Sequence, residues 1–212
     1  MKNFDKSKSF GKLLFDVSII ITSVLIIRTY VASAYQVVGG SMCNTLNYFD
    51  KVCEMGKGDF LLVNKIGTKI QSLNRGDIIV FHPPGYEQES YIKRIIGLPG
   101  ETVVIKGGKV SILNSAHPQG FLLTESYLSE ENTNQTYLHN QHEEKSFIIP
   151  PNHYFVLGDN RQGSTDSRTC FDPLYNPTKC DNIESPFHFV ESSQIEGKAQ
   201  IIIWPLSEMK II

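Results

Sequence analysis

One long run of apolar residues stands near the start of the chain, between Leu13 and Val31. Its only charged residues, Asp16 and Arg28, lie near its ends, where charged side chains can reach the aqueous interface. A helix of about 20 apolar residues is long enough to span the hydrocarbon core of a bilayer. The pattern therefore predicts a transmembrane anchor over 13–34, preceded by a short tail over 1–12.

The tail is basic, because a single acidic residue, Asp5, stands against four lysines, Lys2, Lys6, Lys8 and Lys12. Positive residues next to a membrane helix favour the cytoplasmic side. We therefore expect a single-pass protein of the plasma membrane with a cytoplasmic N-terminus and an extracytoplasmic domain. The alternative is a cleaved signal peptide, with the small residues Ala32-Ser33-Ala34 as its cleavage site, but the apolar run is longer than such peptides usually have.

From Tyr35 onward the apolar residues fall in short runs that end at glycine or proline, which is typical of β-strands. The clearest hairpin joins Val103–Lys106 to Lys109–Leu113 through Gly107-Gly108. The other expected strands are 59–64, 78–81, 91–96, 147–149, 154–157 and 199–204. The fold class is therefore predicted to be mainly β, an antiparallel β-sheet catalytic domain over 35–113 and 147–212 with one N-terminal transmembrane helix.

The stretch from Asn114 to Ser146 differs from its surroundings, because it is rich in Asn, Gln, Glu, His and Ser and has little periodicity. We interpret 114–146 as an inserted, exposed segment. The formal net charge of −2 gives no indication of nucleic-acid binding.

Four cysteines form two pairs along the chain, and neither pair has the close spacing of a zinc site, so we expect no metal. Outside the cytoplasm an even number of cysteines is compatible with disulfides. We expect Cys170 and Cys180 to be bonded, because they share one loop. The sequence leaves open whether Cys43 and Cys53 pair.

Candidate chemistry begins at Gly39-Gly40-Ser41, where two glycines make the serine hydroxyl accessible and leave its amide free to face a substrate. A nucleophilic serine with a backbone oxyanion donor needs this arrangement, although the same three residues also form ordinary turns. His153, near Asp159, is the most credible histidine that could activate Ser41.

A lysine is the other possible base, provided that apolar neighbours keep it neutral. Lys93 fits, because it stands on an expected strand between Ile92 and Ile95-Ile96. The next residue, Arg94, should point to the opposite face of the strand, so one of the two should face inward.

The polar run from Gly158 to Arg168 is either a solvated loop or a scaffold for the site. As a scaffold, its Ser164 hydroxyl could hold the lysine amine. Four charged residues could lock the loop through charge-assisted hydrogen bonds, namely Asp159, Arg161, Asp166 and Arg168.

Four motifs occur in one order behind the expected anchor, and together they resemble bacterial type I signal peptidases, the membrane-bound leader peptidases of the Ser/Lys class. The motifs are Gly-Gly-Ser41-Met42-x-x-Thr45-Leu46, Arg75-Gly-Asp-Ile-Ile-Val, Tyr91-Ile-Lys93-Arg94-x-x-Gly97-x-Pro99-Gly100-Glu101 and Gly158-Asp-Asn-Arg-x-x-Ser164-x-Asp166-Ser-Arg168.

The resemblance implies that Ser41 is the nucleophile, Lys93 the general base and Ser164 the hydroxyl that orients the lysine. The Ser41 amide would be an oxyanion donor, and the charged residues of the polar run would support the site. Two positions depart from the family pattern. Gly39 replaces the serine that some relatives use as a second oxyanion donor, and Asn44 replaces the usual proline, which concerns the rigidity of the turn after Ser41.

The implied function is removal of signal peptides from secreted preproteins by a serine endopeptidase without cofactor, on substrates with small side chains at positions −1 and −3. The partners would be these signal peptides and the lipid bilayer. The substrate would add to a sheet edge along Gln36, Val37, Val38 and Gly39, next to Met42. Two alternatives remain, a Ser/Lys peptidase dedicated to one substrate such as a pilin or conjugation protein, and an inactive anchored β-domain that binds export partners.

Overall fold

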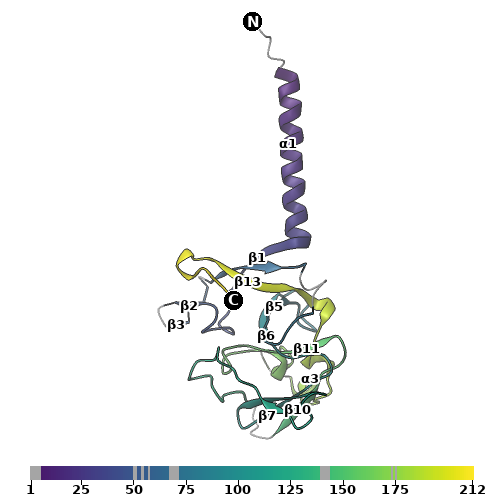
Figure 1. Cartoon of the computed structure of the whole chain (residues 1–212), viewed down its shortest axis with the longest axis vertical. Helices are drawn as coiled ribbons and strands as arrows, with labels where there is room; N and C mark the ends of the chain where they lie inside the picture. The colour runs from purple at the N-terminus through teal and green to yellow at the C-terminus, as the bar shows by residue number, and fades with distance from the viewer. Residues whose placement is uncertain are drawn as a thin grey trace.

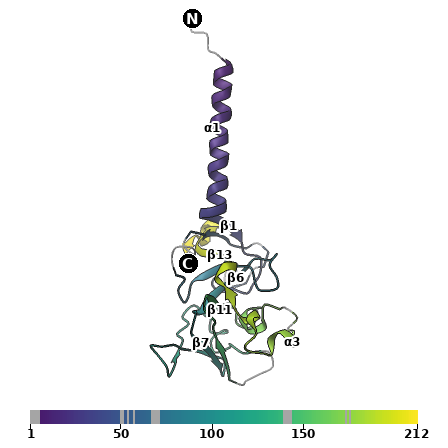
Figure 2. The same cartoon turned by 90° about the vertical axis from the view of Figure 1, so that its right-hand side faces the viewer.

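A long helix projects from a β-rich domain in the computed structural model of the chain (Figure 1). The structure describes residues 6–49, 52–53, 55–56, 58–66, 72–138, 144–172, 174 and 176–212. The helix α1 (Lys6–Ile26) continues as a five-residue π-helical turn, η1 (Ile27–Val31). The stretch Phe10–Val31 is long and apolar enough to cross a membrane, and none of its most apolar window is buried. In the view turned by 90°, α1 still extends clear of the domain, and no other helix or strand of the described residues lies beside it (Figure 2).

The helix ends earlier than the predicted anchor over 13–34. Ala32–Gln36 forms the strand β1, whose residues pair with β4 (Phe60–Asn64) from Ala32 opposite Asn64 to Gln36 opposite Phe60. The three small residues after Val31 are therefore part of the sheet, because the backbone pairing with β4 overrides their continuation of the apolar run.

The main sheet has eight strands in the order β1-β4-β13-β5-β6-β11-β12, and β14 pairs with β13. All its pairs are antiparallel. The remaining bounds are β5 (Ile78–Phe81), β6 (Tyr91–Gly97), β11 (His153–Leu157), β12 (Val190–Glu191), β13 (Ile195–Trp204) and β14 (Lys210–Ile211). The four residues of β5 are all buried, as expected for a short continuous apolar run.

A second sheet has the order β10-β7-β8-β9 and contains the predicted hairpin, β7 (Thr102–Lys106) with β8 (Lys109–Leu113). Gly107 and Gly108 make the turn at φ +54° and +76°, a region that residues with a Cβ rarely adopt. The other strands are β9 (Phe121–Leu122) and β10 (Lys145–Ile148), and a separate pair joins β2 (Tyr48–Phe49) to β3 (Val52–Cys53). Short helical turns are η2 (Ser167–Thr169), α3 (Pro177–Cys180), η3 (Pro186–His188), η4 (Ser192–Gln194) and η5 (Leu206–Glu208). The predicted fold, mainly antiparallel β with one N-terminal helix, is confirmed.

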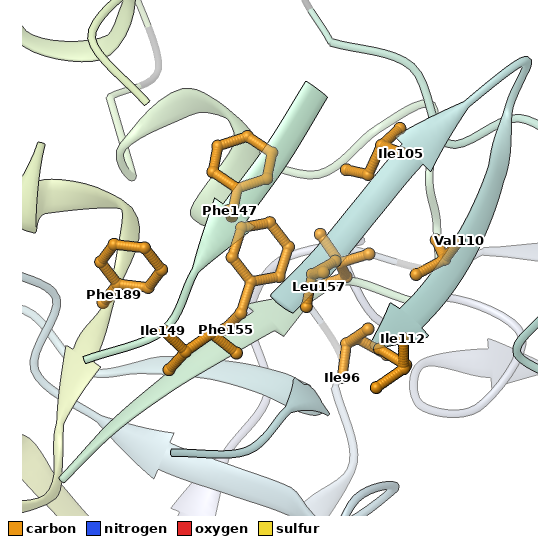
Figure 3. Close-up of a cluster of buried hydrophobic side chains, with 10 residues drawn as sticks. Ile96, Ile105, Val110, Ile112, Phe147, Ile149, Phe155, Leu157 and Phe189 are labelled. Atoms are coloured by element: carbon orange, nitrogen blue, oxygen red, sulfur yellow. The ribbon is translucent and has the colours of Figure 1, made fainter. Parts of the chain in front are cut away.

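Apolar side chains from the two sheets meet in one core cluster (Figure 3). Phe147 of β10 packs against Phe155 of β11 with their ring centroids 4.8 Å apart. A second cluster lies under β1 and β13 around Leu46, Leu61 and Val80. The strand β6 runs between these regions, with Ile96 in the first cluster and Ile92 against the second, and its Lys93 and Arg94 side chains are buried.

The segment 114–146, expected to be exposed, is exposed or half-buried at most of its described residues, but two of them are buried. Asn132 is 5% exposed and Thr136 is 1% exposed. Thr136 forms an isolated β-bridge with Gly108, and Glu125 forms an ion pair with Arg161. The segment also packs on the first core cluster through four partly buried residues, Phe121, Leu123, Tyr127 and Leu138. Its residues 139–143 lie outside the described residues.

The disulfide prediction is wrong for Cys170 and Cys180, which are free and buried, whereas Cys43 is bonded to Cys53. The Cys180 thiol donates to the Thr169 carbonyl at 3.2 Å, and the Cys170 sulfur lies 3.5 Å from Nδ1 of His188. Burial raises the pKa of the Cys170 thiol well above its ordinary value. Both cysteines are therefore neutral, packed thiols with polar partners of their own.

Loss of the Cys43–Cys53 bond is expected to destabilise the domain. The bond spans 10 positions and ties the segment after Ser41 to β3. In the chain-entropy model a loop of this size contributes about 3 kcal/mol. Urea unfolding of the full chain in detergent should show this loss in Cys53→Ser and in reduced wild type. Reductant should have no further effect on Cys53→Ser, and an unchanged midpoint in reduced wild type would contradict the expectation.

Candidate active site

Ser41 stands at the start of a tight turn that follows β1. The amide of Cys43 donates to the Gly40 carbonyl at 3.1 Å, and the amide of Leu46 donates to the Met42 carbonyl at 2.9 Å. Met42 and Leu46 are buried at 1% and 0% exposure and hold the turn on the core. The turn needs no positive φ at the two glycines, and Asn44 instead adopts φ +82°. Proline cannot adopt that angle, so this turn differs from the family pattern in its backbone as well as its sequence.

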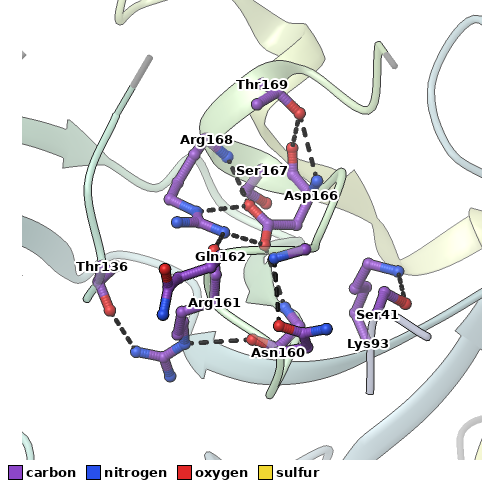
Figure 4. Close-up of polar contacts among 12 residues, drawn as sticks. Ser41, Lys93, Thr136, Asn160, Arg161, Gln162, Asp166, Ser167, Arg168 and Thr169 are labelled. Atoms are coloured by element: carbon purple, nitrogen blue, oxygen red, sulfur yellow. Dashed lines mark hydrogen bonds and ion pairs between the residues drawn. The ribbon is translucent and has the colours of Figure 1, made fainter. Parts of the chain in front are cut away.

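Lys93 of β6 reaches Ser41 across the fold (Figure 4). Its Nζ donates to Ser41 Oγ at 2.8 Å and to the Ile92 carbonyl at 3.0 Å. The side chain is almost completely enclosed, with 3% of Lys93 exposed. Burial lowers the pKa of Lys93 to about 8, although the carboxylates of Asp166 and Asp159 act in the opposite direction. A substantial fraction of this amine is therefore neutral near physiological pH, next to a hydroxyl that it can deprotonate.

Arg94 is buried as well, so both neighbouring side chains are enclosed although they point to opposite faces of the strand. Its Nε and Nη2 atoms donate to the two oxygens of Asp159 at 2.9 and 2.6 Å. Its guanidinium lies 4.0 Å from the ring centroid of Tyr127, and Nη1 donates to the Gly76 carbonyl at 2.8 Å. The strand is covered on both faces at this point. Arg94 binds both oxygens of the Asp159 carboxylate.

The predicted charge lock in the polar loop is present, and it centres on Asp166 and Arg168 (Figure 4). Arg168 Nε and Nη2 each lie 2.9 Å from an oxygen of Asp166. Burial alone would raise the pKa of Asp166, but the Arg168 guanidinium and the hydrogen bonds to the carboxylate lower it overall. Among the described residues no ion pair includes Lys93, so neither carboxylate contacts its amine directly.

Arg161, also predicted to support the loop, is anchored by the 114–146 segment. Its guanidinium donates to both oxygens of Glu125 and to the Thr136 hydroxyl, while Nε donates to the Gly158 carbonyl at 3.1 Å. The sequence did not indicate Glu125 or Thr136, because both stand in a polar stretch that carries no motif.

Asn160 connects this loop to the Ser41 turn. Its amide N–H donates to the Ser41 carbonyl at 3.0 Å, and its side-chain Nδ2 donates to the Gly40 carbonyl at 3.1 Å. Asn160 was not among the predicted site residues, although it stands inside the Gly158-Asp-Asn-Arg motif. A polar side chain in the middle of that motif was the available signal.

Ser164 lies close to the dyad without contacting its amine. A Cβ at Gly158 would come within 2.2 Å of Ser164 Oγ and 2.4 Å of the Ser41 carbonyl oxygen, so only glycine allows this approach. Within the described part of the chain, the buried Ser164 Oγ has no hydrogen-bond partner. Its role in orienting Lys93 stays a prediction. His153, the alternative base, instead contacts the Pro151 carbonyl at 2.8 Å through Nδ1.

A cleft of about 360 Å³ leads to Ser41 and Lys93 between two stretches of extended chain. One wall includes the five predicted substrate-binding residues, Gln36, Val37, Val38, Gly39 and Met42, and the other wall is Ser90, Tyr91, Ile92 and Lys93. β1 is the edge strand of its sheet, and β11 pairs with β6 only from Arg94 onward. Both walls therefore present backbone that these strands leave unpaired, and a peptide strand between them could pair with either.

Comparisons with known proteins show which family the chain belongs to. The family described as "Signal peptidase, peptidase S26" matches residues 10–204. A signal peptidase IB of Staphylococcus aureus is 28% identical over 214 residues, covering 96% of this chain and 94% of the relative. A signal peptidase I of Bacillus caldolyticus is 32% identical over 196 residues, covering 87% and 86%. A crystal structure of a signal peptidase I from Enterococcus faecalis is 30% identical and covers 61% of this chain and 97% of that one, with a TM-score of 0.40. The family match spans the chain from the apolar helix to the end of β13, so the protein belongs to the signal peptidase family.

Proposed function

We propose that the protein is a membrane-anchored serine endopeptidase that removes N-terminal signal peptides, with Ser41 as nucleophile and Lys93 as general base. The observation that carries this assignment is the 2.8 Å contact between Ser41 Oγ and the Nζ of a buried lysine. A serine hydroxyl is a weak nucleophile until a neighbouring base removes its proton, and a neutral amine at this distance can do so.

In this mechanism a substrate strand lies between the walls 36–39 and 90–92, with its scissile carbonyl at Ser41. The neutral Lys93 amine accepts the hydroxyl proton as Ser41 Oγ attacks the carbonyl carbon. The resulting ammonium then protonates the leaving amine, and an ester to Ser41 remains. A water molecule, deprotonated by Lys93, hydrolyses the ester and releases the second product.

The neighbouring groups support these steps. The Ser41 amide donates to the oxyanion that forms at the attacked carbonyl. The Ser164 hydroxyl orients the Lys93 amine, because it lies beside Gly158 together with the Ser41 carbonyl. Asn160 binds the carbonyl groups of both Gly40 and Ser41, so the nucleophile and its amide keep their direction.

For the topology, we infer that the N-terminal tail is cytoplasmic and that the β domain lies outside the plasma membrane. The four lysines before and at the start of the apolar run favour that orientation. The Cys43–Cys53 disulfide agrees with it, since such bonds persist in oxidising surroundings.

The test is labelling with a small acylating serine probe, followed by peptide mapping. We expect one labelled residue, Ser41, in the detergent-solubilised full chain, together with cleavage of a synthetic signal peptide. Ser41→Ala should lose both, whereas the exposed Ser193→Ala should keep both. Absence of label and of cleavage in the wild type would make the protein a binding module rather than a peptidase.

A further inference from the structure

One carboxylate outside the dyad contacts Ser90 of one wall of the cleft and Tyr35, which immediately precedes the other wall. Glu196, the second residue of β13, accepts a hydrogen bond from the Tyr35 hydroxyl through Oε2 and from Ser90 Oγ at 2.9 Å through Oε1. Tyr35 is the β1 residue immediately before Gln36, and Ser90 immediately precedes Tyr91. The two bonds therefore join the two stretches of chain between which the cleft lies.

Two basic side chains complete the surroundings of Glu196. His82 Nε2 lies 3.2 Å from Oε1, and Lys65 Nζ lies 4.0 Å from Oε2. Burial and the bond to Glu196 raise the pKa of Tyr35, so its hydroxyl stays a proton donor. The glutamate is partly enclosed, with 19% of its side chain exposed. Its hydrogen bonds to neutral groups are charge-assisted and stronger than those between neutral groups.

The position of Glu196 distinguishes it from the catalytic groups. Ser41 and Lys93 lie at one end of the two walls, and Tyr35 and Ser90 lie toward the other end. Glu196, Lys65 and His82 line a neighbouring hollow together with Thr29 of η1, the last turn of the membrane helix. A substrate strand that enters from the membrane would therefore pass Glu196 before its scissile bond reaches Ser41.

We propose that Glu196 is a positioning residue that holds the two walls at the separation of one inserted peptide strand. This inference rests on the proposed peptidase function. A substrate strand that pairs with the free edges of β1 and β6 must lie about 4.8 Å from each of these strands. The distance between the two walls must therefore be fixed. Without Glu196, the Tyr35 and Ser90 side chains lose their shared partner, and the walls are free to separate or close. Binding of an extended substrate then weakens, while the chemistry at the dyad is unchanged.

The experiment compares a long and a short substrate on the detergent-solubilised full chain. The long substrate is a peptide with at least eight residues before the cleavage site, and the short one is the acylating probe, which occupies only the Ser41 end. For Glu196→Ala we expect KM for the peptide to rise by about 10-fold or more, the usual effect of losing hydrogen bonds to a charged group. We expect kcat to stay within about twofold and the rate of probe labelling to be unchanged.

Conservative variants separate positioning from folding. Glu196→Gln keeps two hydrogen-bonding atoms and should restore KM to within about threefold of wild type. Tyr35→Phe should raise KM alone, and should add nothing further when combined with Glu196→Ala, because both remove the same contact. Glu144→Ala, which removes an exposed carboxylate paired with Lys106, should leave all constants unchanged.

Three results would overturn the inference. They are an unchanged KM in Glu196→Ala, an equal loss for the peptide and the short probe, and a fall in kcat with constant KM. Failure of the proposed function is a different result, since it would appear as a wild-type protein that neither cleaves the peptide nor reacts with the probe.

Discussion

Replacement of Lys93 with arginine is expected to lower kcat for peptide cleavage by about 10³-fold or more, since general bases contribute up to about 10⁴-fold. Arginine keeps its proton at any pH that the protein tolerates, so it cannot accept the proton of the Ser41 hydroxyl. Steady-state cleavage of a synthetic signal peptide measures the loss. Substantial turnover in Lys93→Arg would contradict the Ser/Lys mechanism.

The same assignment predicts the pH dependence of the wild type. Burial lowers the pKa of Lys93 to about 8, so the amine is mostly charged and inactive below that pH and mostly neutral and active above it. The rate should therefore rise with pH through one ionisation near 8 and then level off. A rate that rises only near 10, the ordinary range for lysine, would show that burial does not activate this amine.

Lys93→Met is the control for folding, and it should behave unusually. Because the pKa of Lys93 is lower in the folded protein than the ordinary 10.5, the buried ammonium destabilises the fold below about pH 8. The cost corresponds to about 3 kcal/mol at 1.36 kcal/mol per pKa unit. Lys93→Met should thus be inactive yet more stable at pH 7. The gain should shrink between pH 8 and 10.5, where the wild type becomes more stable as its unfolded state alone binds the proton.

Replacement of Asp159 with alanine is expected to have the largest effect on stability, about 3–5 kcal/mol, which is typical when one partner of a buried ion pair is removed. The change leaves the Arg94 guanidinium in the interior with the Gly76 carbonyl and the Tyr127 ring as its contacts. Thr45 also loses a carboxylate partner. Urea unfolding of the full chain should show a markedly lower midpoint.

Glu144→Ala is the matched control, because the Glu144 carboxylate pairs with Lys106 at the surface. The two side chains are 49% and 73% exposed, respectively. Exposed pairs add little to stability, so its unfolding midpoint should equal that of the wild type. Equal urea midpoints for Asp159→Ala and wild type would contradict the expectation. They would mean that the remaining contacts of Arg94 are enough to stabilise its buried charge.

The sequence predicted those parts of the molecule that depend on local pattern. The anchor followed from one apolar run, and the hairpin of β7 and β8 followed from two glycines between alternating residues. Ser41 and Lys93 were indicated by a glycine pair and by isoleucines next to a lysine, and the four motifs placed both in one family. The structure adds that their side chains are in contact.

Features that depend on distant partners could not be predicted in this way. Burial of Thr136 and Asn132 arises because buried arginine and loop groups bond to polar residues, so polarity there did not mean exposure. The Cys43–Cys53 bond depends on the return of β3 to the turn after Ser41, which spacing along the chain does not reveal. Glu196 stands outside the four motifs, and the strand order that places β13 between β4 and β5 is what brings it near Tyr35 and Ser90.

The direct passage from η1 into β1 gives the enzyme a short, stiff tether. η1 ends at Val31 and β1 begins at the next residue, Ala32, without a linker. β1 then runs across the axis of α1 (Figure 1). An extended chain covers at most about 3.5 Å per residue, so Ser41 stands no more than about 35 Å from the end of the helix at Val31. The anchor thereby limits the distance from the bilayer at which Ser41 can cleave a substrate. A bond that stays within this reach of the bilayer can be cut, and one that has moved farther from the lipid is safe even if its sequence would fit the cleft.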